Sequence, residues 1–378
     1  MKIAFVLDDS LDKTDGVQQY VLTLSAWLRE QGHDVHYIVG ETTRTDLPNI
    51  HSVSRNVNVR FNHNRMSIPL PTSKRTLRAL LAAEQFDVLH VQLPYSPWMA
   101  RRVIQAAGPR TVVIGTFHIA PHSWLVHAGN ILLNLCIHRS LRRFDHIMSV
   151  SSVAQAFAKQ TYGIVSDVVP NTVDLRPFLQ AKPLPQYEDV RTVVFLGRLV
   201  ERKGCHHLLE AVRLMHEAGL PAMPFRVIIC GRGPLEQSLK DYVRTNHLEQ
   251  IVTFVGFVPE AEKPRYLASA DVAIFPSTGG ESFGIVLLEA MAAARGVVLG
   301  GNNPGYASVM RNHPEALFDP TNAGILAETL SNWLTDATAR EEAYDWQHAY
   351  VAQFDVPAVG QEIVTIYERA LQARQNMR

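Results

Sequence analysis

The sequence is poor in cysteine and in net charge, and each shortage excludes a class of protein. Only three of its 378 residues are cysteines, Cys136, Cys205 and Cys230, and none forms a Cys-x-x-Cys pair. They predict reduced thiols in a cytoplasmic protein, with neither a disulfide framework nor a structural zinc site. The 36 basic residues balance 36 acidic ones, which argues against a strongly basic nucleic-acid-binding protein.

Long apolar runs are also missing. The first apolar stretch, residues 3–7, meets Asp8 and Asp9 at once, so it is too short for a signal peptide. Residues 111–138 contain no Asp, Glu, Lys or Arg, but Pro121, Gly129 and four histidines interrupt the apolar residues. A membrane-spanning helix needs about 18 or more predominantly apolar residues, and we expect none here.

Two common nucleotide-binding fingerprints are absent. A nicotinamide-dependent oxidoreductase is expected to carry Gly-x-Gly-x-x-Gly after its first strand, where this chain reads Leu-Asp-Asp-Ser-Leu over residues 7–11. The phosphate-binding pattern Gly-x-x-x-x-Gly-Lys-Ser/Thr of nucleoside triphosphatases occurs nowhere. Both classes are therefore excluded.

What is present is an alternation of short buried strands with amphipathic helices, broken once by four prolines between residues 170 and 185. Such alternation predicts parallel sheets with right-handed crossovers, here an α/β fold of two doubly wound domains. We expect one domain over residues 1–172 and a second over 173–357. The predicted strands are 2–7, 34–39, 86–91, 111–117, 146–150, 192–196, 225–230, 252–255, 272–275 and 297–299.

Two glycine-rich turns in the second half suit an anionic ligand. Arg198 and Lys203 follow a predicted strand, and Gly204 opens the next helix. Cations at a helix N-terminus match a diphosphate, although an exposed basic loop would have the same sequence. After another strand, Gly231 and Gly233 allow the backbone to approach a ligand closely, with an ordinary turn as the alternative.

The most specific segment is 279–290, in which Glu281 and Glu289 lie eight residues apart. Glu289 falls in an otherwise apolar helix, where a buried carboxylate is costly unless it is paired or bound to a ligand. Glu281 lies in the turn at the helix N-terminus, where backbone N–H groups are free. This spacing suits the hydroxyl groups of a sugar, and salt bridges within the domain are the alternative.

These motifs resemble those of the retaining nucleotide-sugar glycosyltransferases of family four (glycosyl transferases group 1), which have the GT-B fold. The likeness is greatest to the bacterial phosphatidylinositol mannosyltransferases. It extends to 16–18, 115–118, 169–174 and 254–259. It implies two Rossmann-like domains facing a cleft, the first binding the acceptor and the second the nucleotide sugar. It also implies that the last helix, about 358–378, crosses back to the first domain.

The resemblance also implies residue roles. Arg198 and Lys203 hold the donor diphosphate, Glu281 contacts the sugar hydroxyls, and Glu289 binds the ribose. His118 faces the reacting sugar, so the implied catalytic residues are His118, Glu281, Arg198 and Lys203; a structural histidine is the alternative for His118. Further donor contacts are implied for Gly16, Gly231, Val258, Glu260, Lys263, Phe283, Gly284 and Ile285. Members of the family usually carry paired glycines where this chain has Asp15-Gly16, so we expect Asp15 to cap the helix.

The implied reaction proceeds with retention, and the leaving phosphate acts as the base. It needs no cofactor beyond the nucleotide sugar, and a divalent metal would at most stimulate it. GDP-mannose is the favoured donor and a UDP-hexose or UDP-N-acetylhexosamine is the alternative. A catalytically inactive sugar-nucleotide-binding homologue is a third hypothesis.

The neutral total hides an uneven distribution of charge. Residues 1–183 hold 19 basic and 13 acidic side chains, whereas 184–378 hold 17 and 23. A predicted helix at 73–81 places Lys74, Arg75 and Arg78 on one side and leucines on another, as in a helix bound to an anionic membrane surface. We therefore expect a peripheral protein at the inner face of the plasma membrane with a lipid or polyol acceptor, which the resemblance places at Gln18, Asn62 and His118. No nucleic-acid partner is expected.

Overall fold

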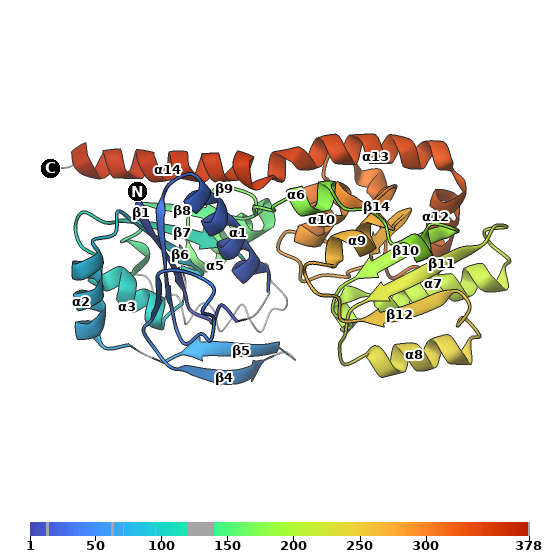
Figure 1. The fold of residues 1–378 in the computed structure, drawn as a ribbon, viewed down its shortest axis with the longest axis horizontal. Helices are drawn as coiled ribbons and strands as arrows, with labels where there is room; N and C mark the ends of the chain where they lie inside the picture. Colours follow the sequence, from blue (N-terminus) through green and yellow to red (C-terminus); the bar gives the residue numbers. More distant parts are fainter. Residues whose placement is uncertain (13–14, 62–63, 71, 95, 120–139, 377–378) are drawn as a thin grey trace. The chain divides into compact units, whose positions relative to one another are not determined.

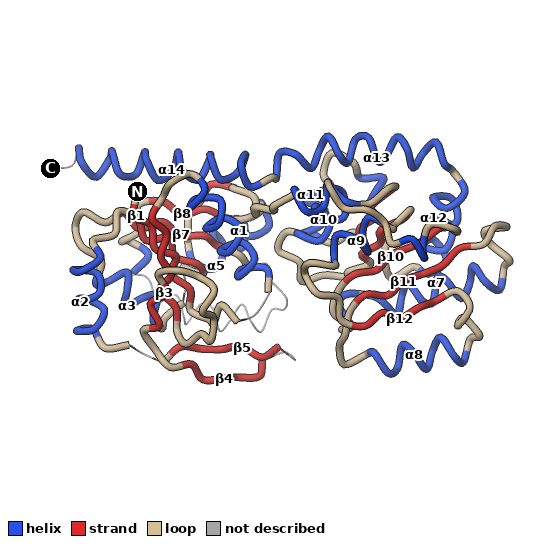
Figure 2. Tube along the Cα trace, viewed as in Figure 1, coloured by secondary structure: helices blue, strands red, loops and turns tan. Residues whose placement is uncertain are grey.

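The computed structural model describes the chain except residues 13–14, 62–63, 71, 95, 120–139 and 377–378 (Figure 1). It divides into two compact units, residues 1–172 with 356–378 and residues 173–355. In each unit, strands form a sheet and helices flank it, as Figure 2 shows by colour. The α/β architecture predicted from the alternating sequence pattern is confirmed.

The first unit is built on a seven-stranded parallel sheet with the order β3-β2-β1-β6-β7-β8-β9. The order steps outward from β1 in both directions, which is doubly wound topology. The strands are β1 (Lys2–Leu7), β2 (Asp34–Val39), β3 (Ile50–Ser52), β6 (Val88–Gln92), β7 (Val112–Phe117), β8 (His146–Ser149) and β9 (Asp167–Val168). A separate antiparallel pair consists of β4 (Asn56–Phe61) and β5 (Asn64–Pro69).

Helices cover both faces of this sheet because alternate residues of each buried strand point to opposite sides. Ile3, Phe5 and Leu7 share a core with helices α1 (Gly16–Glu30) and α14 (Val356–Asn376). The other face packs against α2 (Lys74–Glu84) and α3 (Met99–Ala106). Helix α5 (Ser152–Tyr162) contacts β7, β8 and β9.

Helix α14 is the final segment and packs in the first unit, as the sequence predicts. Its Val359, Ile363 and Tyr367 are buried in the core beside α1. At Gly360 an added Cβ would lie 2.6 Å from the Trp27 ring, so only glycine allows this approach of α14 to α1. Among the described residues, no helix is both long enough and apolar enough to span a bilayer.

The second unit holds a six-stranded parallel sheet with the order β12-β11-β10-β13-β14-β15. Its strands are β10 (Arg191–Leu196), β11 (Phe225–Cys230), β12 (Val252–Gly256), β13 (Val272–Phe275), β14 (Val297–Gly301) and β15 (Leu317–Phe318). Its helices are α6 (Arg176–Leu179), α7 (Cys205–Glu217), α8 (Glu236–Thr245), α9 (Lys263–Ala268), α10 (Ile285–Ala293), α11 (Pro304–Met310), α12 (Ala323–Thr335) and α13 (Ala337–Val351). Helix α10 contacts α6, α9 and α13.

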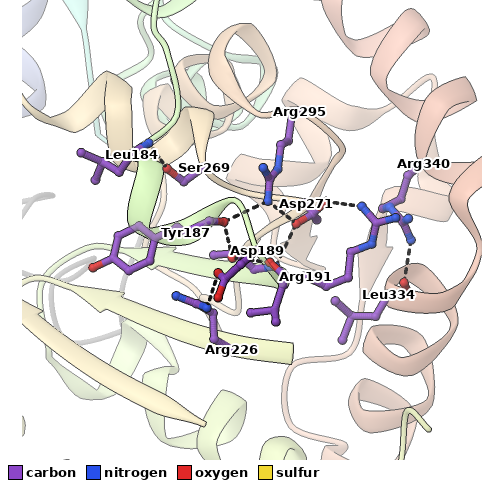
Figure 3. Close-up of polar contacts among 12 residues, drawn as sticks. Leu184, Tyr187, Asp189, Arg191, Arg226, Ser269, Asp271, Arg295, Leu334 and Arg340 are labelled. Atoms are coloured by element: carbon purple, nitrogen blue, oxygen red, sulfur yellow. Dashed lines mark hydrogen bonds and ion pairs between the residues drawn. The ribbon is translucent and has the colours of Figure 1, made fainter. Parts of the chain in front are cut away.

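The buried carboxylate of Asp271 links the amino-terminal ends of β10 and β13 through hydrogen bonds (Figure 3). Asp271 accepts hydrogen bonds of 2.8 Å from Arg191, from Arg295 and from the backbone N–H of Thr192. Arg295 also donates to the carbonyl of Tyr187, so the segment entering the sheet is held to the same cluster. Because every oxygen of Asp271 faces a donor, the buried charge is compensated.

Candidate functional site

The carboxyl ends of β10 and β13 carry the candidate donor site of the second unit, and close backbone contacts shape it. At Gly204 an added Cβ would lie 1.9 Å from the carbonyl oxygen of Pro276, and at Gly231 1.9 Å from that of Gly197. Both glycines have positive φ angles, 70° and 148°. Side chains are therefore excluded where these loops meet, because each glycine packs against protein backbone. An approach of these glycines to a ligand stays a prediction.

Glu281 lies at the centre of this cluster. Its Oε1 lies 2.7 Å from Arg202 Nη1 and 2.8 Å from Lys203 Nζ, and the hydroxyl of Ser277 donates to the same oxygen over 2.9 Å. Burial alone would raise the pKa of Glu281, but Lys203 and Arg202 outweigh it and lower the pKa below its usual value. The carboxylate is therefore ionised and compensated at neutral pH.

Arg202 is the residue that the sequence reasoning missed. The one-turn helix Glu201–Lys203 brings it to Glu281, next to the predicted Lys203. The signal was its place in the basic turn, but spacing alone could not show which of three cations reaches the carboxylate. Arg198, the other predicted cation, is exposed on the same loop.

The turn after Glu281 leads into α10. Gly284 has a φ of 123°, and Ile285 is the first helical residue. Phe283 is buried and its ring meets Phe354 edge-on at 5.9 Å. An added Cβ at Gly305 would lie 2.1 Å from the Glu281 carbonyl oxygen, so α11 closes on this turn through a glycine.

A second ion pair joins α9 to α10. Lys263 Nζ lies 2.9 Å from Glu289 Oε1 and 2.7 Å from Glu260 Oε2, and the Lys263 and Glu289 side chains are only 8% and 5% exposed. Burial would lower the pKa of Lys263, but Glu289 and Glu260 outweigh it and raise the pKa. Val258, two residues before Glu260 in the sequence, is also buried. The three charged residues predicted for the nucleoside are thus adjacent, and the alternative of an internal salt bridge is also present in the structure.

In the first unit, His118 follows the carboxyl end of β7 and is 7% exposed. Its Nε2 lies 2.7 Å from Oε1 of Gln92, the last residue of β6, and its ring meets Tyr20 edge-on at 5.0 Å. Burial lowers the pKa of His118 to about 3, so the ring is neutral at physiological pH. Because Gln92 Oε1 is an acceptor, Nε2 carries the proton and Nδ1 is left as an acceptor.

The other residues predicted for this unit are Gly16, Gln18, Asp15 and Asn62. Gly16 opens α1, and the buried Gln18 side chain donates to the carbonyl of Ser10 over 3.1 Å. Asp15 stands at the N-cap position, but its side chain makes no capping hydrogen bond, so the prediction of a capping role is wrong. Asn62 lies outside the described residues.

Asp8 is a second residue that the sequence reasoning did not assign. It follows β1 and its carboxylate accepts from the backbone N–H of Ala100 over 2.7 Å and from the hydroxyl of Ser96. Burial raises the pKa of Asp8 to about 6, against the opposing effect of these hydrogen bonds. Asp8, Gln92 and His118 therefore place polar groups at the ends of three neighbouring strands, where ligands of open α/β sheets bind.

The basic helix predicted near residue 73 is α2. Lys74, Arg75 and Arg78 are exposed, whereas Leu77 is fully buried and Leu80 and Leu81 pack against the same core. The leucine side therefore belongs to the interior of the first unit. Only the cationic side is presented outward, so any membrane contact through this helix would be electrostatic.

Comparison with known proteins defines the class and then the family. Anabaena HepE in complex with UDP matches over 98% of this chain and all of its own, with a TM-score of 0.77 and 18% identity, and it has also been solved with UDP-glucose. The fold is thus that of the GT-B glycosyltransferases. Residues 14–176 match the model described as Glycosyltransferase Family 4, and 179–347 that described as Glycosyl transferases group 1.

Curated relatives extend the match to nearly the whole chain. The phosphatidyl-myo-inositol mannosyltransferase of Mycolicibacterium smegmatis is 31% identical, covering 97% of this chain and 94% of its own length. The protein of that name from Mycobacterium tuberculosis H37Rv is 30% identical, with 97% of both chains covered. This chain belongs to the family of GT-B glycosyltransferases that contains these enzymes, and the resemblance stated from its motifs is confirmed.

Proposed function

We propose that this protein transfers mannose from GDP-mannose to a lipid-linked or polyol acceptor at the cytoplasmic face of the membrane, with retention of the anomeric configuration. The observation that carries the proposal is the cluster in which Glu281 lies within 2.8 Å of Lys203 and Arg202. Two cations and a carboxylate side by side suit a substrate that joins an anionic diphosphate to a hydroxyl-rich sugar. The relatives are phosphatidyl-myo-inositol mannosyltransferases, which supports mannose as the sugar and an inositol lipid as the acceptor.

The chain's own groups suffice for the proposed steps. The bond between the sugar's anomeric carbon and the diphosphate oxygen breaks while a bond to the acceptor oxygen forms on the same face. The acceptor proton passes to the departing phosphate, which Lys203 and Arg198 neutralise. Glu281 orients the sugar hydroxyls, and His118, with Nδ1 as an acceptor, receives a hydrogen bond from the reacting sugar. Positioning and preorganised charge provide the catalysis.

The nucleoside is assigned to the second ion pair. Glu289 would accept from the ribose hydroxyls, while Val258, Glu260 and Lys263 would lie beside the base. A UDP-sugar donor is the second candidate, because Anabaena HepE shares the fold and has been solved with UDP-glucose. The two donors differ in the base, so they are distinguished by a direct comparison.

The experiment is a lipid-product assay. Purified protein is incubated with GDP-mannose, and separately with UDP-glucose, in the presence of liposomes with or without phosphatidylinositol. Mass spectrometry of the extracted lipid should show one added hexose only with GDP-mannose and only when the inositol lipid is present. A hexosylated product from UDP-glucose alone would replace the proposed donor, and hexosylation of other lipids would replace the acceptor.

A further inference from the structure

Three side chains of types that bind metal ions lie close together in the first unit. His36 lies on β2, His51 on the neighbouring β3, and Glu84 is the last residue of α2. One side-chain atom of each lies within 4.8 Å of those of the other two. The cluster adjoins Lys2 and Asp34, the first residues of their strands, whereas Asp8, Gln92 and His118 lie at the carboxyl ends.

The two imidazole rings face each other through ring nitrogens. His36 Nδ1 lies 3.0 Å from His51 Nε2, and the ring planes differ by 1°. Glu84 Oε1 lies 4.0 Å from the same nitrogen of His51. Zinc bonds of about 2.0–2.1 Å in a tetrahedron separate neighbouring ligand atoms by about 3.3 Å, and the two measured separations lie on either side of that value.

His36 is oriented from its other side. Its Nε2 lies 3.1 Å from Asp34 Oδ1, and the same oxygen accepts from the amide of Asn49 over 3.3 Å. A carboxylate that accepts the second ring N–H fixes the tautomer and leaves Nδ1 as the ligand, which is the outer-shell arrangement of histidines in metal sites. His36 is also buried, so its orientation is held by packing.

Glu84 is positioned by a hydrogen bond from Lys2. Lys2 Nζ lies 2.6 Å from Glu84 Oε2, and the other carboxylate oxygen, Oε1, lies on the side of His51.

We propose that His36, His51 and Glu84 form a binding site for one late first-row divalent cation, with Zn²⁺ as the probe, and that Asp34 acts as the outer partner of His36. Two imidazoles and one carboxylate are a ligand set for such ions, with a water completing the coordination. The bound ion would tie β2 and β3 to the end of α2. This role is separate from sugar transfer, so it does not depend on the proposed function.

The test is calorimetric titration of the untagged full chain with zinc chloride. We expect one zinc per chain to bind at this site, and His51→Gln or Glu84→Gln to abolish that binding. Asp34→Asn should weaken it by about tenfold or more, since it removes only the outer partner. His216→Gln is the control, because His216 is exposed on α7 of the second unit. Absence of saturable zinc binding, or binding unchanged in both ligand variants, would overturn the proposal.

Two further measurements separate ligation from folding. Zinc should raise the melting temperature of the parent protein and leave that of His51→Gln unchanged, because only the ligated native state gains stability. Lys2→Met should tighten zinc binding by about twofold to fivefold, since it removes a competing cation from Glu84. A purely structural polar cluster would show neither effect, and that result would also overturn the proposal.

Discussion

The ammonium of Lys203 lies 2.8 Å from Glu281 Oε1, and this contact joins the two residue types proposed to act on opposite parts of the donor. A diphosphate that approaches Lys203 must share the cation with Glu281. The same carboxylate oxygen also accepts hydrogen bonds from Arg202 and from the hydroxyl of Ser277. The turn is therefore preorganised by ion pairs before any donor binds.

Replacement of Glu281 by glutamine should separate catalysis from nucleotide binding. Glutamine keeps the shape but removes the charge, so transfer should fall by about a hundredfold or more. GDP should bind as tightly as before or more tightly, because Lys203 and Arg202 lose their anionic partner. Steady-state rates and GDP titration measure the two effects. The control is Glu217→Gln, which removes a surface partner of Arg213; weaker GDP binding by Glu281→Gln would argue against the proposed division of roles.

The Lys263–Glu289 pair offers a test that distinguishes a ligand-binding role from a structural one. Glu289→Gln should lower the free energy of unfolding by about 1–3 kcal/mol, since it removes one charged partner of Lys263 and leaves Glu260 as the other. The double replacement Lys263→Met with Glu289→Leu should recover stability to within about 1 kcal/mol. Urea denaturation measures both values.

Nucleotide binding then decides the role of this pair. If Glu289 binds the ribose, the stable double variant should still lose donor affinity. If the double variant bound the donor as tightly as the wild type, the Lys263–Glu289 pair would have only a structural role. Loss of the exposed pair Lys240–Glu236 is the control and should change stability by about 0.5 kcal/mol or less.

The buried histidines predict a loss of stability in acid. Burial lowers the pKa of His118 and of His90 to about 3, whereas an unfolded histidine titrates near 6.5. Below about pH 6.5 the unfolded chain binds protons that the native state does not, so each histidine removes about 1.4 kcal/mol per pH unit. Asp8 has the opposite effect between about pH 6 and 4. Its pKa is raised in the native state, so the native state binds a proton before the unfolded chain does, and acid increases the free energy of unfolding.

Urea denaturation at pH 7.5 and pH 5.0 isolates this effect. Between pH 7.5 and pH 5.0, the loss of unfolding free energy should be about 2 kcal/mol smaller for His118→Asn than for the parent protein, because the variant lacks this buried titrating group. Equal slopes for the two proteins would contradict the buried, neutral state of His118. The transfer rate should likewise show no ionisation of His118 between pH 5 and 8.

Helix α2 should make membrane binding depend on salt. Replacing Lys74, Arg75 and Arg78 by glutamine should weaken binding to anionic liposomes by about a hundredfold, at about 1 kcal/mol per cation. Flotation at low and high salt measures this. The control carries the same charge change at Lys240, Arg244 and Arg265 of the second unit. Equal flotation with anionic and neutral lipid would remove α2 from the account.

Much of the fold could be predicted because buried parallel strands are continuous apolar runs. The sequence predicted the bounds of β1, β2 and β11 as they are observed. The β4–β5 pair was not predicted, although residues 56–61 alternate polar and apolar side chains as strands do. Helices α12 and α13 were also left out of the prediction.

The site was predictable in its residue types and less so in its partners. Gly204 and Gly231 were singled out for approach to a ligand, whereas the contacts that require glycine there are with the backbone of Pro276 and Gly197. The contacts of Glu281 with Arg202, of His118 with Gln92 and of His36 with His51 join separate segments. Only the fold determines such contacts, because local spacing carries no information about which strands become neighbours.

The most direct test of the account is a donor comparison read by released nucleotide. With phosphatidylinositol liposomes present, the protein should release GDP from GDP-mannose faster than it releases UDP from UDP-glucose or UDP-N-acetylglucosamine, and Glu281→Gln should release neither. A clear preference for a UDP-sugar, or an undiminished rate in Glu281→Gln, would contradict the central claim that this turn acts on GDP-mannose.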